Sequence, residues 1–356
     1  MNNYSDKFGY YSIGDYCTYS KLEAIELHQK INIHPKWHFN DFVFGNFDWS
    51  IEPKESLKEL YAIRAKQIRE KYDYLVLWYS SGSDSQNILE TFIDNQIRLD
   101  EIASCWALEG DNRYDTHFNG EIYERAIPTA LKIVDNDKTI KHRVIDLTRM
   151  ILEIYSDKNF KHDFLYHSNS MFSPNNATKS FFREKIDDYK RIIDSGKSLC
   201  FIHGADKPRI FLENGRYCLK FIDLIDTCVN NRTMQLARPW EHDEFFYWSA
   251  DLPQLIAKQA HIVKNYLRGN SINLSDFELG ERGKSFGVLE KNGNLLYLTS
   301  EAMQRLIYGF SIASMKPSNF AFSTRDAWFW SKPEYFDQAQ IYINGIKKLE
   351  SVLPKH

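Results

Sequence analysis

Residues 75–87 decide the fold, and they read Leu75-Val76-Leu77-Trp78-Tyr79-Ser80-Ser81-Gly82-Ser83-Asp84-Ser85-Gln86-Asn87. An apolar run stops at a loop of serines and one glycine, and apolar residues then recur at helical spacing, at Ile88, Leu89, Phe92 and Ile93. A strand, a tight loop and a helix build an anion site in open α/β sheets, because the loop N–H groups and the helix N-terminus converge there. The segment therefore predicts a phosphate-binding loop; a serine-rich surface turn is the alternative.

Asp84 carries the only charge in this loop. Phosphates repel a carboxylate unless a cation lies between them, so Asp84 is predicted to be a Mg²⁺ ligand. The alternative role for Asp84 is the N-cap of the following helix, where its carboxylate would accept backbone N–H groups. The two roles can coexist in part.

The loop Ser80-Ser81-Gly82-Ser83-Asp84-Ser85 resembles the Ser-Gly-Gly-x-Asp-Ser loop of the PP-loop ATP pyrophosphatases, which include asparagine synthetase, GMP synthetase, argininosuccinate synthetase and tRNA lysidine synthetase. Ser81 stands where the family has its first glycine, and the other defined positions match. The resemblance implies a HUP-like fold and cleavage of ATP between its α and β phosphates, with ATP and Mg²⁺ as cofactors. It implies that residues 80–85 hold the phosphates. It also implies that adenine lies near Leu77, Trp78 and Ala107.

A second segment, Phe201-Ile202-His203-Gly204-Ala205-Asp206-Lys207-Pro208-Arg209, also leads from a strand into a small-residue turn. It is similar to a later Gly-x-Asp segment of asparagine synthetase, so Gly204 and Asp206 would help to hold magnesium pyrophosphate. Lys207 replaces a family acid, which suggests that Lys207 contacts a phosphate directly. His203 is a candidate general base near the substrate. The alternatives are a solvated β-turn and a hydrogen-bonded histidine at the end of a strand.

Two further polar segments complete the candidate site. PP-loop enzymes commonly present the segment after the second strand to the substrate, so Arg113, Asn119 and Glu121 are predicted to bind it. A mobile surface loop is the alternative. Lys316 is predicted to cover the α-phosphate, where charge builds up during adenylation, and a solvated lysine is the alternative. The residues predicted to act in catalysis are thus Asp84, Lys207 and Lys316.

Apolar runs predict strands at residues 74–78, 100–108, 142–147 and 198–203, and helical spacing predicts helices at 55–71, 85–95 and about 121–134. This alternation predicts a doubly wound, mainly parallel, Rossmann-like α/β sheet, in which ligands bind beyond the carboxyl ends of the strands. Asn214-Gly215 and Asn292-Gly293 each predict a hairpin. The predicted organisation is an N-terminal extension packed on the core (1–56), an ATP-binding domain (57–235) and a mostly helical C-terminal region (236–356).

The composition is that of an ordinary globular protein, with 43% hydrophobic and 26% charged residues among 356. The sequence has no apolar run of about 18 residues for a membrane span, and residues 1–6 show no signal-peptide core. Five cysteines without a C-x-x-C pair predict reduced thiols in a cytoplasmic protein. The net charge of −3 disfavours nucleic acid as a partner. The aromatic content of 15% points to a homodimer.

The predicted function is adenylation of a small-molecule substrate. A substrate oxygen attacks the α-phosphorus, pyrophosphate leaves, and ammonia, an amine or another nucleophile then attacks the adenylate. Two alternatives stay open. One is a tRNA-modifying PP-loop enzyme. The other is a nucleotide-binding sensor without turnover, in which Ser81 and Lys207 would mark a decayed site.

Overall fold

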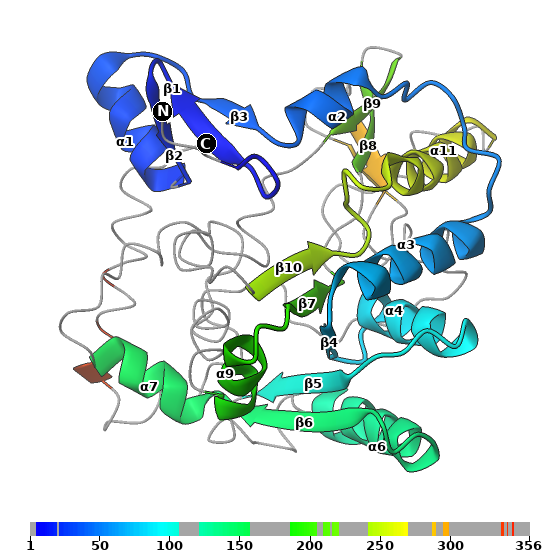
Figure 1. Cartoon of the computed structure of the whole chain (residues 1–356). Coiled ribbons are helices and arrows are strands. Elements are labelled where there is room, and N and C mark those ends of the chain that lie inside the picture. The colour runs from blue at the N-terminus through cyan, green and yellow to red at the C-terminus, as the bar shows by residue number, and fades with distance from the viewer. Residues whose placement is uncertain are drawn as a thin grey trace.

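The computed structural model describes residues 5–19, 21–106, 121–156, 186–204, 209–213, 216–220, 241–269, 287–289 and 295–298, and positions 336, 337, 340 and 344. A sheet of five parallel strands lies at its centre, in the order β10-β7-β4-β5-β6 (Figure 1). These strands are β4 (Tyr74–Trp78), β5 (Glu101–Trp106), β6 (Lys141–Asp146), β7 (Leu199–His203) and β10 (Glu241–Phe245). The four predicted strands are confirmed as β4, β5, β6 and β7. The fifth, β10, comes from beyond residue 235.

Helices lie on both faces of this sheet because side chains alternate along each strand. Leu75 and Leu77 of β4 belong to the core cluster that also holds Phe92 of α4 (Ser83–Asp94). On the opposite face, Trp78 stacks on Phe201 at 5.2 Å, and the Phe201 ring meets Tyr189 of α9 (Asp187–Asp194) at 5.3 Å. The predicted Rossmann-like α/β fold is therefore present.

The predicted helices are also confirmed, with small shifts at their ends. A capping box between Ser56 and Glu59 starts α3 (Leu57–Lys71), and each side chain bonds the backbone of the other residue. The third predicted helix forms as a π-helix (Glu121–Ala126) followed by α6 (Ile127–Asn136). The chain then continues through β6 into α7 (Thr148–Ser156).

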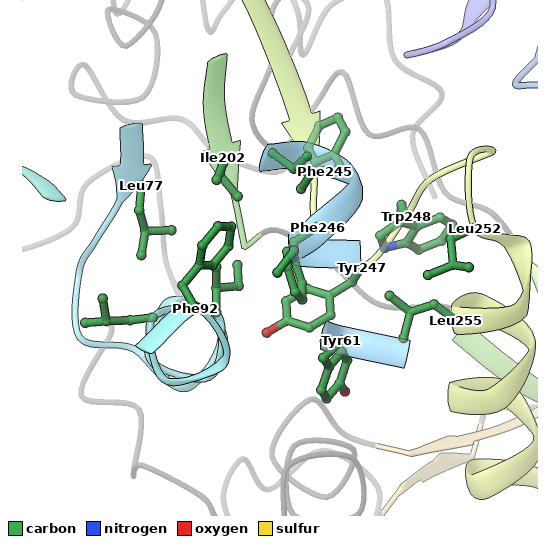
Figure 2. Packing of buried hydrophobic residues seen from close by; sticks show 14 of the residues in the cluster. Tyr61, Leu77, Phe92, Ile202, Phe245, Phe246, Tyr247, Trp248, Leu252 and Leu255 are labelled. Carbon is green, nitrogen blue, oxygen red and sulfur yellow. The ribbon is translucent and has the colours of Figure 1, made fainter. Parts of the chain in front are cut away.

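A run of four aromatic residues, which begins at the last residue of β10, forms the middle of the core. Phe245, Phe246, Tyr247 and Trp248 pack between Tyr61 of α3, the first residues of α11 (Pro253–Gly269) and Phe92 of α4 (Figure 2). All four are buried. This run therefore ties the edge strand β10 to the helices that cover one face of the sheet.

The N-terminal residues form a small antiparallel sheet, β2-β1-β3, with the strands β1 (Tyr10–Ile13), β2 (Tyr16–Thr18) and β3 (Lys36–His38). The helices α1 (Lys21–Ile31) and α2 (Asp41–Asn46) accompany it (Figure 1). The unit packs on the segment around β10, where the Phe8 and Phe245 rings lie 5.4 Å apart and the Phe39 and Trp248 rings 6.1 Å apart.

A third sheet is antiparallel, in the order β11-β12-β8-β9. Its strands are β8 (Arg209–Glu213), β9 (Arg216–Lys220), β11 (Gly287–Leu289) and β12 (Leu295–Leu298). Both predicted hairpin pairings are confirmed, β8 with β9 and β11 with β12. Most of the predicted helical C-terminal region beyond α11 lies outside the described residues. Within the described residues, no helix is long and apolar enough to cross a membrane.

Glu244 of β10 is the centre of a buried charge network. Its carboxylate accepts hydrogen bonds from Arg64 Nη2 at 2.6 Å, Tyr72 Oη at 2.5 Å and Lys7 Nζ at 3.0 Å. The Arg64 and Glu244 side chains are 1% and 2% exposed. Burial acts to raise the pKa of Glu244, but the charges of Arg64 and Lys7 outweigh burial and lower it. The network therefore joins the N-terminal unit and α3 to the edge of the parallel sheet.

We expect Glu244→Gln to lower the free energy of unfolding by about 3–5 kcal/mol, because it leaves the buried Arg64 guanidinium with only the more distant, half-exposed carboxylate of Asp251 at 3.7 Å. The measurement is urea denaturation at neutral pH. Glu70→Gln is the matched control, since Glu70 and its partner Lys66 are 66% and 72% exposed and should change stability by less than about 1 kcal/mol. Equal effects of the two substitutions would contradict a buried network.

Candidate functional site

The candidate site lies where the order of the parallel strands reverses. From β4 the chain proceeds to β5 and β6 on one side, whereas β7 and β10 add to the other side of β4. The chain therefore adds its next parallel strand on one side of the sheet after β4 and on the other side after β7. In sheets of this kind the reversal point, at the carboxyl ends of the strands, is where ligands bind. Residues 79–82 and Gly204 occupy that position.

The segments after β4 and β7 touch at Gly204. A Cβ atom placed on Gly204 would lie 3.1 Å from Asp84 Cβ and 3.2 Å from the backbone nitrogen of Ser85. A side chain at Gly204 would be tightly packed against the first turn of α4, which would have to shift by a few tenths of an ångström to admit it. The structure thus brings together two of the segments that the sequence assigns to one site.

Ser81 has a left-handed backbone conformation, with φ of +57°. This is the position where the resembling family has a glycine, which adopts such a φ without steric cost. Serine pays roughly 1–2 kcal/mol there, because its Cβ crowds the following carbonyl oxygen. Ser81 is nevertheless buried, with 4% of its surface exposed. The loop keeps the backbone shape that a glycine would favour, at the expense of local strain.

The serine hydroxyls hold the loop closed. Ser85 Oγ accepts a hydrogen bond from the Ser80 backbone N–H at 3.3 Å and donates to the Gly82 carbonyl at 3.1 Å. Ser80 Oγ in turn accepts from the Gly82 backbone N–H at 3.4 Å. Ser80 and Ser85, both predicted to contact phosphate, thus shape the loop itself.

The N-cap residue of α4 is Gly82, so Asp84 does not fill that role. No side chain caps this helix, and Asp84 lies in its first turn together with Ser83 and Ser85. An N-terminus without a side-chain cap can direct its N–H groups and its dipole at an anion. The capping alternative for Asp84 is therefore wrong, and its role as a Mg²⁺ ligand stays a prediction.

Tyr247 hydrogen-bonds the first turn of α4, and Tyr61 packs against Tyr247. Tyr247 Oη donates to the Asp84 carbonyl at 2.8 Å and accepts from Asn87 Nδ2 at 3.0 Å. The ring of Tyr61 lies against Tyr247 with centroids 5.8 Å apart (Figure 2). Burial, and to a lesser degree the charge of Asp84, raises the pKa of the Tyr61 phenol. Neither tyrosine was predicted to lie at the site. For Tyr247, the aromatic run at 245–248 was the sequence signal that could have indicated it.

His203, at the end of β7, pairs with Asp243 of β10. Its Nε2 donates to Asp243 Oδ1 at 2.5 Å, and both residues are buried. The register places His203 opposite Phe245, whose ring centroid lies 5.6 Å from the imidazole. This is the hydrogen-bonded histidine at a strand end that stood as the alternative to a general base, whose role stays a prediction. A carboxylate hydrogen-bonded to one ring nitrogen also fixes the orientation of the imidazole, as an aspartate does for a histidine that acts as a general base.

The adenine contacts predicted at the end of β4 stay predictions. The Leu77 side chain is fully buried in the core cluster that also holds Ile202 and Phe92 (Figure 2), because alternation along β4 turns it inward. Trp78 points to the other face and stacks on Phe201. The apolar sequence of β4 does not show which face each side chain points to, because both faces of β4 are covered and both carry apolar residues.

The other predicted site residues cannot be placed at the site. Ala107, Arg113, Asn119, Asp206, Lys207 and Lys316 lie outside the described residues. Glu121 is the first residue of the π-helix, and its side chain is likewise outside the description. Among the residues that the structure describes, no group of three His, Cys, Asp or Glu side chains could hold a metal ion. Asp84 is therefore the predicted metal ligand that the structure does locate.

No protein-family model matches the chain, and no curated protein matches its sequence.

The strain at Ser81 can be isolated by comparing two substitutions that both remove the hydroxyl. We expect Ser81→Gly to be more stable than Ser81→Ala by about 1 kcal/mol, because glycine adopts the left-handed φ without a Cβ clash. Urea denaturation of the two variants measures the difference. An alanine variant as stable as the glycine variant would contradict a left-handed conformation at this position.

We expect Gly204→Ala to destabilise the protein by about 1–3 kcal/mol, because the added methyl group must displace the first turn of α4. Gly45→Ala is the matched control: Gly45 lies in α2, and a Cβ there meets nothing within 4 Å. This control should be neutral or slightly stabilising. Thermal unfolding of both variants tests the close approach, which would be refuted by a Gly204 variant that unfolds like the Gly45 variant.

Proposed function

We propose that this chain is an ATP pyrophosphatase of the PP-loop kind, with a HUP-like arrangement of its sheet, and that it adenylates a small-molecule substrate. The observation that carries the proposal is the contact between Gly204 and the first turn of α4 at the reversal point of the sheet. A loop of the matching sequence occupies the position where Rossmann-like sheets bind ligands. Gly204, from the second segment that the resemblance suggests, lies against the first turn of the helix that follows this loop.

The triphosphate of ATP would lie along residues 80–85 and the N-terminus of α4. The uncapped helix end offers N–H groups and the positive end of its dipole to the leaving pyrophosphate. Mg²⁺ usually binds one or two carboxylates together with phosphate oxygens and water, so Asp84 alone, or with Asp206, is a sufficient donor set. The bound ion would neutralise part of the phosphate charge.

The other predicted residues would complete the site from its rim. Lys207 and Lys316 would approach the phosphates, and Arg113, Asn119 and Glu121 would bind the substrate. His203 would accept a proton from the second nucleophile, with Asp243 holding the imidazole in one orientation and stabilising its protonated form. The substrate oxygen attacks the α-phosphorus, pyrophosphate leaves, and the incoming nucleophile releases AMP.

Phosphorus NMR of ATP and Mg²⁺ with the purified protein tests this function. A small-metabolite extract supplies the substrate, and we expect AMP and pyrophosphate to form only when the extract is present. Asp84→Ala should lower the rate by about a hundredfold or more, because an electrostatic partner of the transition state is lost. Asp94→Ala, at the other end of α4, is the matched control and should retain activity.

The products separate the alternatives. ADP and phosphate would contradict the proposal outright. Tight ATP binding without turnover would favour a nucleotide sensor instead. Turnover that depends on added tRNA rather than on the extract would favour a nucleic-acid-modifying enzyme.

A further inference from the structure

The N-terminal sheet carries a hydrogen-bonded chain of three side chains, Ser12, His38 and Asp41, which we call the Ser12 relay. Ser12 Oγ and His38 Nε2 lie 2.8 Å apart, and His38 Nδ1 and Asp41 Oδ2 lie 2.6 Å apart. The residues come from β1, β3 and the first turn of α2. Both ring nitrogens are thus engaged, one by a hydroxyl and the other by a carboxylate.

The direction of the relay follows from the hydrogen-bonding capacity of its members. An ionised carboxylate can only accept, so His38 Nδ1 must carry the proton that lies between it and Asp41. In the neutral imidazole, Nε2 then has a lone pair, and the Ser12 hydroxyl donates to it. This is the order in which a serine nucleophile, a histidine base and an orienting acid act together.

Neighbouring groups fix the imidazole and the carboxylate. The Tyr10 ring stacks on His38 with centroids 4.7 Å apart and an interplanar angle of 16°. Asp41 Oδ1 accepts from the Phe39 backbone N–H at 3.1 Å. Burial acts to raise the pKa of Asp41, but the hydrogen bonds from His38 and Phe39 outweigh it and lower the pKa. Asp41 is therefore held as the carboxylate that the relay requires.

The register of the small sheet sets the distance between nucleophile and base. Tyr10 pairs with His38 and Ser12 pairs with Lys36, so Ser12 and His38 are diagonal neighbours on one face. Gly9 leaves room for the Trp37 ring of β3, since a Cβ at Gly9 would lie 1.9 Å from that ring. The opposite face of β1 carries Tyr11 and Ile13, which form the packed side of the sheet. Packing of the sheet therefore does not account for the relay.

The relay can be reached from solvent. Ser12 is half-buried, the His38 side chain is 16% exposed, and the Asp41 side chain is 51% exposed. Lys36 is exposed and is the direct cross-strand partner of Ser12.

We propose that Ser12, His38 and Asp41 form a nucleophilic site for activated acyl esters, on a different sheet from the phosphate loop and independent of its function. Ser12 Oγ attacks the ester carbonyl while its proton passes to His38 Nε2. The ester C–O bond breaks, and the leaving alcohol takes that proton. Water then attacks the acyl carbon and gives a proton to His38, and the carboxylic acid leaves as Ser12 Oγ is reprotonated. Asp41 is a positioning residue.

A fluorophosphonate probe tests the proposal with the full-length protein. Ser12 Oγ displaces fluoride from phosphorus, and the adduct stays covalently attached. We expect one adduct per chain by intact mass, mapped to Ser12 by peptide sequencing, and none at that position in Ser12→Ala. His38→Gln can keep hydrogen bonds to both partners but cannot act as the base, so labelling should slow by about a hundredfold or more.

Three further variants, together with thermal unfolding, distinguish loss of the nucleophilic site from failure to fold. Ser50→Ala removes another exposed serine that hydrogen-bonds an aspartate, and it should label like the native protein. Asp41→Asn should slow labelling and Asp41→Glu should restore it in part, because a carboxylate again orients His38. Thermal unfolding identifies any variant that fails to fold. Absence of labelling at Ser12, or native rates in His38→Gln, would overturn the proposal.

Discussion

The pairing of β4 with β7 is the constraint on which the rest of the architecture depends. These strands are hydrogen-bonded in parallel from Tyr74 opposite Leu199 to Leu77 opposite Ile202. The chain adds strands outward from this pair in both directions, so the order of the parallel strands reverses there. Gly204 then allows the first turn of α4 to approach within van der Waals contact. A phosphate-sized anion at the helix N-terminus would be bordered by both segments.

The edge strand β10 links this central pair to the N-terminal unit. Asp243 faces His203 of β7, while the adjacent Glu244 faces Arg64 of α3 and Lys7 from the start of the chain. The aromatic run that follows β10 then supports α4 through Tyr247. One short strand and the aromatic residues at its end therefore position a histidine at the candidate site, anchor a separate sheet and support the first turn of α4. The two proposed sites are structurally connected through β10, although their chemistry is distinct.

Much of the parallel sheet could be predicted from the sequence because β4, β5, β6 and β7 are short, mostly apolar runs between helical patterns. The strand β10 could not. Its sequence, Glu241-His242-Asp243-Glu244-Phe245, resembles a solvent-exposed segment, and its burial depends on partners at Arg64 and His203 that are distant in sequence. Local patterns carry no information on such pairing.

The candidate site, like the fold, could be predicted only where local sequence determines the structure. The loop at 80–85 and Gly204 could be found because their small residues serve local backbone geometry. Tyr247 beneath α4 and the contact of His38 with Ser12 depend on packing and on strand register, so sequence spacing does not reveal them. The direction of the buried Leu77 side chain was not predictable either, because an apolar strand covered on both faces does not show which side chains point toward the ligand edge.

Hydrogen–deuterium exchange with and without ATP and Mg²⁺ tests the central claim most directly. The account predicts that ATP slows exchange of the backbone amides of residues 79–86 and 203–204, where two neighbouring parallel strands end. Amides in β1 and β3 serve as the internal reference and should not change. Unchanged exchange at residues 79–86 under saturating ATP, or protection confined to another part of the chain, would contradict a phosphate site at the reversal point of the sheet.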